Sequence, residues 1–471
     1  MSTIVSAPGK VLVAGGYLVL DPAYSGVVVS TSSRFYTVIR SQPSVPANTI
    51  LVRSPQFDAA AWTYEIKENG DVEPAESNTS KNKFVHLALQ NTLALASQIH
   101  NAPVKLEQGL DIAIVGDNDF YSQRAELERL KLPRTLSSLS SIRPFAPQGL
   151  PLSQVHKTGL GSSAALITSL VTGLLLHFHV IPSLDDESNR NLAHNTAQFI
   201  HCLAQGKVGS GFDVSAAVFG SHLYTRFEPG VLSGLMEGTQ NASLATVLSP
   251  SNKSWNHKIQ EFKLPPLTRI MLADVDAGSD TPSLVGKVLK WRKENPVEAN
   301  DLWNAIDKKN MELASTLLRL SELYDTNSKA YKSAVEKLAN APAAQWSANA
   351  SDEVTKTFVQ AHEITEAIRA LMRTMSTATS VPIEPAEQTR LLDACLGQKG
   401  VLGGGVPGAG GYDAIYLLVL DTPSVLQGVD NLWAGYEELG VSPLNAVESK
   451  GKGVRVEVLD AVKGLGEAIK A

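Results

Sequence analysis

The chain has few cysteines, no long uninterrupted hydrophobic run and no excess of basic residues. Its two cysteines, Cys202 and Cys395, lie far apart and fit no metal-binding spacing, so we expect reduced thiols. The most apolar stretch, residues 166–181, is interrupted by polar residues and is too short to cross a bilayer. The N-terminal residues lack the basic and apolar regions of a signal peptide. These absences predict a cytoplasmic protein that does not bind membranes.

The balance of charge excludes another class of function. The formal net charge is −6, whereas a protein that binds nucleic acid in general needs a basic face. With 471 residues, of which 43% are hydrophobic and 19% charged, the chain is an ordinary globular protein with room for two or three domains. We expect no nucleic-acid partner and no obligatory protein partner.

Two familiar nucleotide-binding motifs are missing, although three glycine-rich loops are present at 157–165, 206–213 and 403–413. No Gly-Lys-Ser or Gly-Lys-Thr tripeptide occurs, which excludes a P-loop. The sequence that starts at Gly159 has alanine at the third glycine of the dinucleotide fingerprint. A nucleotide site here therefore needs another design.

The loop at 157–165 leads into an apolar, helix-forming run. A helix that begins there would direct its free N–H groups and the positive end of its dipole at the loop, which favours a bound phosphate. A glycine turn with a serine N-cap explains the same residues. The spacing alone leaves both interpretations open.

The apolar pattern predicts an α+β chain in two halves that join near residues 220–230. Strands are expected at Thr3–Ser6 and Val11–Ala14, on either side of a turn at residues 7–10. Residues 123–154 are charged and then rich in serine and proline, which predicts an irregular segment. Long amphipathic helices are expected after residue 281, followed by a buried strand at Ala414–Leu420.

Three segments together resemble the motifs of the GHMP small-molecule kinases, in the order of that family. They are Ala7-Pro-Gly-Lys10, Gly159-Leu-Gly-Ser-Ser-Ala-Ala165 and Pro407-Gly-Ala-Gly-Gly-Tyr-Asp413. Within the superfamily the chain is similar to the fungal-type phosphomevalonate kinases, on residues 6–21, 157–164 and 204–213. The resemblance implies a ribosomal-protein-S5-like N-terminal domain, expected at 1–225, and a ferredoxin-like C-terminal domain, expected at 226–471.

The resemblance implies transfer of the γ-phosphoryl group of ATP to (R)-5-phosphomevalonate, with Mg²⁺ as the metal. It assigns the catalytic lysine to Lys10 and the catalytic aspartate to Asp213. A hydroxyl that reaches the metal is expected from Ser163 or Ser162. The residues expected to hold the nucleotide are Lys157, Gly159, Leu160, Gly161, Ser162, Ser163, Ala164 and Ala165.

The acceptor carries a phosphate of its own, so its site should contain extra cations. Lys157 and Lys207 flank two of the loops and are the candidates. Ser279, with Thr281 at the start of a predicted helix, offers another anion-binding terminus, and a simple helix cap explains it equally well. The other residues expected beside the substrate are Tyr17, Ser210, Gly408, Ala409 and Gly410.

Two departures from the superfamily pattern affect the metal and the base. Gly15-Gly16 stands where a Gly-Glu pair is common, and residues 191–212 contain no acid where related kinases often place a metal ligand. Metal coordination then depends on serine, nucleotide phosphates, water and Asp213. Because the second pKa of a phosphate is about 6, the acceptor is largely ionised near neutral pH. Asp213 is therefore expected to orient Lys10 and the metal rather than to remove a proton.

Other activities of the same fold are the main alternatives. Mevalonate kinase and diphosphomevalonate decarboxylase would use similar motifs, but the loop at 206–213 with Lys207 favours phosphomevalonate as the substrate. A non-catalytic ligand sensor would be expected to lack Lys10 or Asp213, and both are present.

Overall fold

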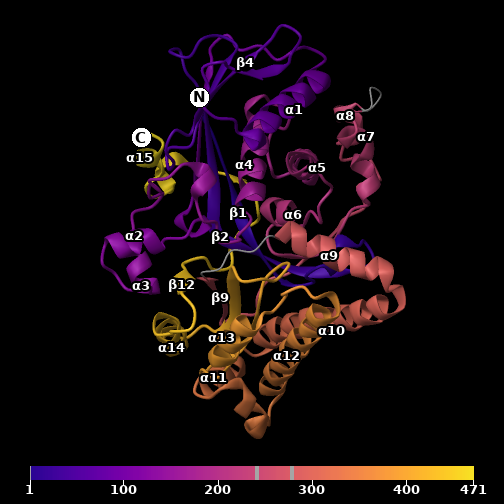
Figure 1. Cartoon of the computed structure of the whole chain (residues 1–471), viewed down its shortest axis with the longest axis vertical. Coiled ribbons are helices and arrows are strands. Elements are labelled where there is room, and N and C mark those ends of the chain that lie inside the picture. The colour runs from indigo at the N-terminus through magenta and orange to yellow at the C-terminus, as the bar shows by residue number, and fades with distance from the viewer. Residues whose placement is uncertain (1, 239–242, 276–280, 471) are drawn as a thin grey trace.

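The computed structural model describes residues 2–238, 243–275 and 281–470. Over these residues the strands form two β-sheets, one in each half of an elongated molecule (Figure 1). The half drawn from indigo to magenta carries the larger sheet, and the half drawn from orange to yellow carries the smaller one with its long helices.

The larger sheet has nine strands in the order β13-β1-β2-β6-β3-β4-β5, with β7 paired to β2 and β8 to β7. All neighbours are antiparallel except β3 and β6. The strands span β1 Ser2–Ala14, β2 Ser25–Ser41, β3 Thr49–Arg53, β4 Ala61–Ile66, β5 Val72–Pro74, β6 Leu110–Gly116, β7 His222–Thr225, β8 Lys258–Glu261 and β13 Arg455–Val456.

The turn expected at residues 7–10 is wrong, because β1 runs through it as one strand. The register against β2 shifts between Pro8 and Lys10, which is a β-bulge. Pro8 has no N–H to donate, and the backbone N–H of Lys10 donates instead to Leu160 at 2.9 Å. A Cβ on Gly9 would lie 2.9 Å from that same carbonyl oxygen. The Pro-Gly pair therefore joins β1 to the first glycine loop instead of reversing the chain.

Four helices pack against one another beside the larger sheet, and three of them contact its strands. Helix α4 is buried along most of its length, which explains why its sequence is mainly apolar. No helix in the described ranges is long and apolar enough to cross a membrane. The four helices are α1 Lys83–His100, α4 Ser162–His177, α5 Glu187–Gln205 and α6 Phe212–Phe219.

The connecting segments contain short helices. The stretch expected to be irregular, 123–154, holds α2 and α3 with loops between them. The short helices are α2 Arg124–Arg129, α3 Leu136–Leu139, α7 Ser233–Met236 and α8 Leu244–Val247. Single 3-10 turns lie at Leu18–Leu20, Asn118–Phe120, Leu152–Gln154, Pro229–Leu232, Ala343–Asn349 and Leu459–Ala461.

The smaller sheet is antiparallel in the order β10-β11-β9-β12. Helix α12 packs along α10 and reaches β10, so the helices cover this sheet as one layer (Figure 1). The elements of this half are β9 Thr268–Val275, α9 Thr281–Glu294, α10 Pro296–Thr326, α11 Ser328–Leu338, α12 Glu353–Thr379, α13 Ala386–Leu396, β10 Val401–Gly405, β11 Ala414–Leu420, α14 Pro423–Ala434 and β12 Val441–Leu444.

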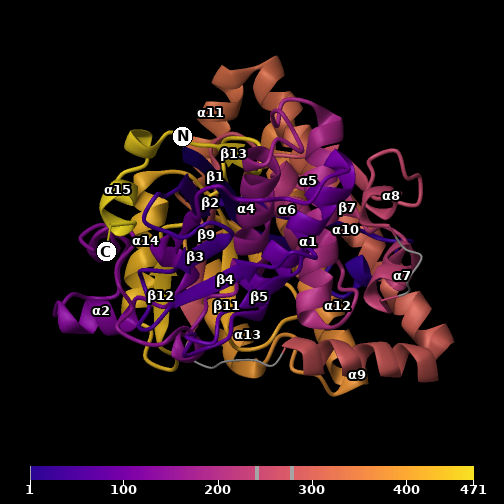
Figure 2. The same cartoon turned by 90° about the horizontal axis from the view of Figure 1, so that it is seen from above.

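The C-terminal segment returns to the N-terminal half. Strand β13 pairs with β1, and helix α15 Leu465–Ala468 lies near the N-terminus in both views (Figures 1 and 2). The guanidinium of Arg34 donates to the carbonyl of Gly453 at 2.7 Å. The larger sheet thus takes β8 and β13 from beyond residue 225, and the expected domain division at 225/226 stays a prediction.

Candidate active site

The first glycine loop ends at the N-terminus of helix α4. Gly159 and Gly161 have φ angles of +77° and +79°, which only glycine adopts without strain. Gly161 is the N-cap, and no side chain in the described part of the chain caps the helix. The alternative interpretation of this loop, a turn with a serine N-cap, is therefore wrong. The first N–H groups of α4 face the loop without a side-chain acceptor among the described residues. This arrangement suits an oxyanion.

The ammonium of Lys10 lies against this loop. Its Nζ donates to the carbonyl of Gly159 at 2.9 Å and lies 5.3 Å from the ring centre of Phe212. Burial lowers the pKa of Lys10 from its usual value, and the nearby Asp213 carboxylate opposes that shift. Lys10 is thus fixed beside the anion-binding loop, with a carboxylate in range.

Asp213 lies in the first turn of α6, at the end of the second glycine loop. Its Oδ1 accepts the backbone N–H of Val214 at 2.9 Å. Its Oδ2 lies 3.8 Å from Nε2 of His201, and the side chain is 21% exposed. One carboxylate oxygen is therefore held by the helix while the other stays accessible.

His201 is a site residue that the sequence analysis missed. It projects from α5, is 4% exposed, and lies between two predicted site residues. Its Nε2 is 3.1 Å from Oγ of Ser163 and 3.1 Å from Nε2 of Gln205. A histidine in an otherwise helical stretch gives no local signal of such a role, because only packing of α5 beside α4 brings it to Ser163.

Buried side chains hold the second glycine loop from behind. The Arg226 guanidinium donates to the carbonyls of Val208, at 3.0 Å, and Gly209. The amide of Gln198 donates to the carbonyl of Gly211 at 2.6 Å. Sequence alone gave no sign of this support, because the donors come from α5 and from the end of β7.

The third glycine motif is partly strand. Residues 403–405 belong to β10, so the loop expected at 403–413 begins only after Gly405. The Tyr17 hydroxyl donates to the carbonyl of Ala409 at 2.5 Å. A Cβ on Gly16 would lie 2.4 Å from the carbonyl oxygen of Gly408. Residues 15–17 and 408–409, which belong to opposite halves, therefore meet directly.

The remaining predicted residues are dispersed. Lys157 and Lys207 are exposed at the edges of their loops. Ser210 takes part through its carbonyl, which accepts the hydroxyl of Tyr224 at 2.8 Å. Ser279 lies outside the described residues.

A polar cluster at the end of β9 was also not predicted from the sequence. The carboxylate of Asp274, almost fully buried, accepts the hydroxyl of Ser122 at 2.9 Å and lies 3.4 Å from Arg124 Nε. His156 Nε2 is 3.3 Å from the same carboxylate, and this contact raises the pKa of His156. The cluster joins the segment before Lys157 to the smaller sheet.

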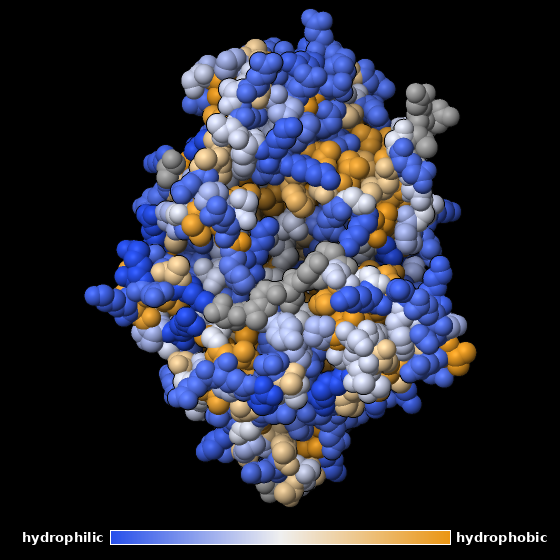
Figure 3. All heavy atoms as spheres, in the orientation of Figure 1, coloured by the Kyte–Doolittle hydropathy of each residue, from blue (hydrophilic) through white to orange (hydrophobic). Residues whose placement is uncertain are grey.

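The site lies where the two halves face each other. A small pocket there is lined by Lys10 and Gly159 on one side and by Leu272, Pro407 and Ala414 on the other. Figure 3 shows a recess between the halves on this face. Residues 10–11 and 158–160 of one half and residues 272–273, 407 and 414–415 of the other thus line the same pocket.

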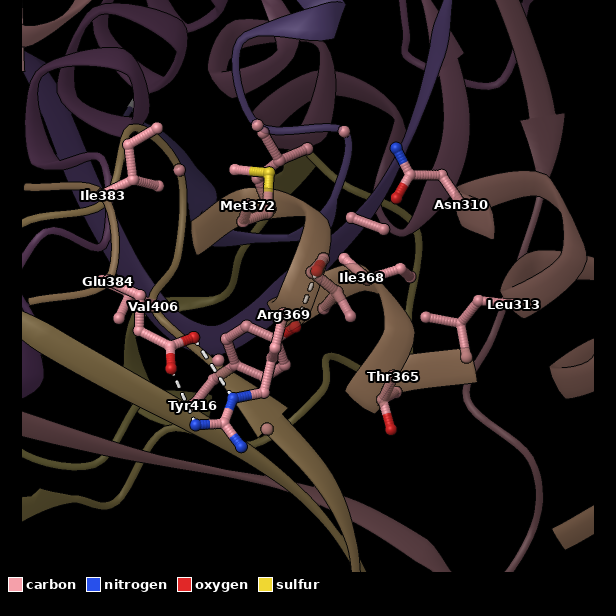
Figure 4. Close-up of a pocket in the computed structure, with 18 residues that line it drawn as sticks. Asn310, Leu313, Thr365, Ile368, Arg369, Met372, Ile383, Glu384, Val406 and Tyr416 are labelled. Atoms are coloured by element: carbon pink, nitrogen blue, oxygen red, sulfur yellow. Dashed lines mark hydrogen bonds and ion pairs between the residues drawn. The ribbon is translucent and has the colours of Figure 1, made fainter. Parts of the chain in front are cut away.

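A second cavity lies behind the third loop (Figure 4). Gly15, Gly16 and Gly408 form part of its wall. The amide of Asn310 on α10 is fully buried, and neither its nitrogen nor its oxygen has a hydrogen-bond partner among the described residues. Such a group costs free energy unless something in the cavity pairs with it.

The donor set fits Mg²⁺. Ser163 offers a hydroxyl oxygen and Asp213 an accessible carboxylate oxygen, and hard oxygen donors are what this ion takes. The described residues contain no group of three or more His, Cys, Asp and Glu side chains able to hold a metal alone. This agrees with an ion held mainly through nucleotide phosphates and water, with only one or two protein ligands.

Comparison with known proteins identifies the class. Residues 148–221 match the family described as "GHMP kinases N terminal domain", and residues 359–434 match "GHMP kinases C terminal". The crystal structure of Streptococcus pneumoniae phosphomevalonate kinase in complex with phosphomevalonate and AMPPNP has the same fold, with a TM-score of 0.60 and 18% identity over 95% of this chain and 99% of that one. The chain has the two-domain fold of the GHMP kinases, and the predicted fold class is confirmed.

Curated relatives show to which family of GHMP kinases the chain belongs. The chain is 39% identical over 460 residues to the peroxisomal phosphomevalonate kinase of Arabidopsis thaliana, covering 89% of this chain and 90% of that one. It is 36% identical over 511 residues to the phosphomevalonate kinase of Aspergillus fumigatus, covering 98% of each. The chain belongs to the phosphomevalonate kinase family, as its motifs predict.

Proposed function

We propose that the protein transfers the γ-phosphoryl group of ATP to (R)-5-phosphomevalonate, giving (R)-5-diphosphomevalonate and ADP. One observation carries the proposal: in a chain of this family, Lys10 lies against the glycine loop at the α4 N-terminus, within electrostatic range of Asp213. Phosphoryl transfer needs positioning and positive charge more than covalent chemistry, and this site offers both.

The nucleotide phosphates bind at Gly159–Ala165 in this proposal. The free N–H groups of α4 donate to phosphate oxygens, and the two positive-φ glycines let the backbone approach closely. Lys10 stabilises the negative charge of the γ-phosphoryl group during transfer. Its bond to the Gly159 carbonyl holds the ammonium at the loop before substrate arrives.

The reacting oxygen belongs to the phosphate of the acceptor. It forms the new bond to the γ-phosphorus while the bond from that phosphorus to the ADP oxygen breaks. Because the acceptor phosphate is already ionised near neutral pH, with a second pKa of about 6, no proton must be removed. Asp213 therefore orients Lys10, whose charge it supports.

Mg²⁺, when bound with ATP, neutralises the phosphate charge. Ser163 and Asp213 are the residues that would hold it.

The substrate lies between the second and third glycine loops. Tyr17 and Ala409, already hydrogen-bonded, close one side, with Gly408 and Gly410 beside them. Lys157 and Lys207 are exposed and free to turn toward the phosphate of the acceptor. Ser210 and Ser279 complete the proposed contacts.

The test compares ADP release with mevalonate, phosphomevalonate and diphosphomevalonate, each supplied with Mg²⁺ and ATP. We expect turnover with phosphomevalonate alone. Turnover only with mevalonate, or only with diphosphomevalonate, would assign one of the other activities of this fold. No turnover with any of the three would support a non-catalytic ligand sensor.

We propose the cytoplasm as the compartment, on the basis of two buried free cysteines. The Arabidopsis relative is named as peroxisomal, so imaging of a tagged full-length chain decides between the two. Peroxisomal fluorescence would overturn the cytoplasmic assignment.

A further inference from the structure

His201 lies at the centre of three polar groups, two of which are expected to touch the metal. Its Nε2 is 3.1 Å from Ser163 Oγ, 3.1 Å from Gln205 Nε2 and 3.8 Å from Asp213 Oδ2. The ring is 4% exposed and so cannot exchange these partners for bulk water. It stands on α5, in the stretch 191–212 that contains no acid.

The geometry fixes which atom donates. An amide nitrogen can only donate a hydrogen bond, so Gln205 donates to Nε2 of His201. That nitrogen is then the unprotonated one of the ring, and its single lone pair is shared by the amide of Gln205 and the hydroxyl hydrogen of Ser163. The lone pairs of Ser163 consequently point away from His201.

We propose that His201 is a positioning residue for the metal: it accepts the hydroxyl hydrogen of Ser163 and so directs the lone pairs of Ser163 at the Mg²⁺ bound with ATP. A serine hydroxyl is a good metal ligand only when its hydrogen points elsewhere, and partners that orient ligands in this way strongly affect metal affinity. This inference rests on the proposed function and adds to it a residue that the motifs do not contain.

The test measures metal-dependent nucleotide binding rather than turnover. Calorimetry gives the Kd of AMPPNP with Mg²⁺ and with EDTA, and the ratio of the two is the metal enhancement. We expect His201→Leu to lower this ratio about tenfold or more while the Kd in EDTA stays unchanged. His201→Gln, whose amide oxygen can still accept from Ser163, should restore most of it.

Two further measurements separate positioning from folding. In a Ser163→Ala background, His201→Leu should cause no further loss, because both changes remove one interaction. Gln205→Glu, at an exposed position, should also lower the ratio, since a carboxylate can only accept and so favours the ring form that carries its hydrogen on Nε2, which leaves Ser163 without an acceptor. A simple charge effect would raise metal affinity instead. His222→Gln, a buried histidine outside the site, should leave the ratio unchanged.

The inference is overturned if His201→Leu keeps the wild-type ratio, if its effect adds fully to that of Ser163→Ala, or if Gln205→Glu raises the ratio. A wild-type chain that binds no AMPPNP would instead overturn the proposed ATP site itself.

Discussion

At the scale of single residues, the site combines one cation and one carboxylate at a glycine loop. Lys10 is held by the Gly159 carbonyl, and Asp213 is held by the backbone of α6. The sequence motifs predicted both residues, and the packing of α5 added His201. Asp213 could remove a proton or only orient Lys10, and these two roles predict different kinetics for the variants.

Substitution of the two charged residues separates these roles. We expect Lys10→Met to lower kcat by about 10³-fold or more, since cations that stabilise a transferring phosphoryl group supply that much. Asp213→Asn should lower kcat only a few-fold, because an ionised acceptor needs no base. Steady-state kinetics with phosphomevalonate at pH 7.5 measures both. If kcat falls equally far in both variants, and kcat of the Asp213→Asn enzyme rises partly at higher pH, Asp213 acts as a base.

At the scale of elements, tight backbone approaches hold the glycine loops in place. Gly408 and Gly410 both have positive φ, of +68° and +80°. A Cβ on Gly410 would lie 2.2 Å from the carbonyl oxygen of Ile383, whereas Gly408 has open space. The two positions therefore share backbone strain and differ in steric clash.

Alanine at these two glycines should give unequal losses. Gly410→Ala must displace the third loop, and a displacement of about 1 Å can lower kcat/KM by about 10²-fold. Gly408→Ala adds only φ strain, so its kcat/KM for phosphomevalonate should fall much less. Kinetics of the two variants side by side checks this. Equal losses would mean that the contact with Ile383 does not position the loop.

Helix α10 carries the amide of Asn310, which has no hydrogen-bond partner among the described residues. Asn310→Leu replaces it with an apolar side chain of similar volume, and an unpaired buried polar group costs about 1–3 kcal/mol. We expect a higher Tm with unchanged kcat, measured by calorimetry and the ADP assay. A lower Tm would indicate that the cavity in Figure 4 holds a hydrogen-bonding partner for the amide.

At the scale of the whole molecule, a cluster of buried histidines lies behind the second glycine loop, on α5, β7 and the segment before β8, and Gln198 contacts both His194 and the carbonyl of Gly211. The rings of His194 and His257 are 4.4 Å apart, and His222 lies in the same cluster. Burial lowers the pKa of His222 and of His257 to about 4 each, and lowers that of His194 as well. Arg190 and Lys258 line the adjoining cavity.

This cluster predicts acid sensitivity with a definite sign. These histidines stay neutral in the fold, while in the unfolded chain they bind protons near pH 6.5. The free energy of unfolding should therefore fall as the pH drops from about 6.5 toward 4. His257→Gln should make that fall shallower, as measured by urea unfolding at several pH values.

His156 provides the opposite control. Its pKa is raised in the fold by Asp274, so its contribution is fully present below pH 6.5 and is lost as the pH rises through the folded value. His156→Gln should therefore lower the free energy of unfolding by a nearly constant amount below pH 6.5, leave the slope of the acid-side fall unchanged, and matter less as the pH rises above 6.5. A His257→Gln chain with the wild-type slope would contradict the assignment to this cluster.

The sequence by itself determined the family and the α+β fold class, and it predicted Lys10, Asp213 and the first glycine loop as parts of the site. These features depend on residues that are neighbours in the sequence: the glycines that adopt positive φ, and the residues that start the helix with an open N-terminus. Only the tertiary structure decided the rest: the bulge that turns Lys10 toward Leu160, the return of the C-terminal segment, and the contacts of His201 and Tyr17. Each joins segments distant in sequence, and no periodicity or spacing along the chain encodes such a meeting.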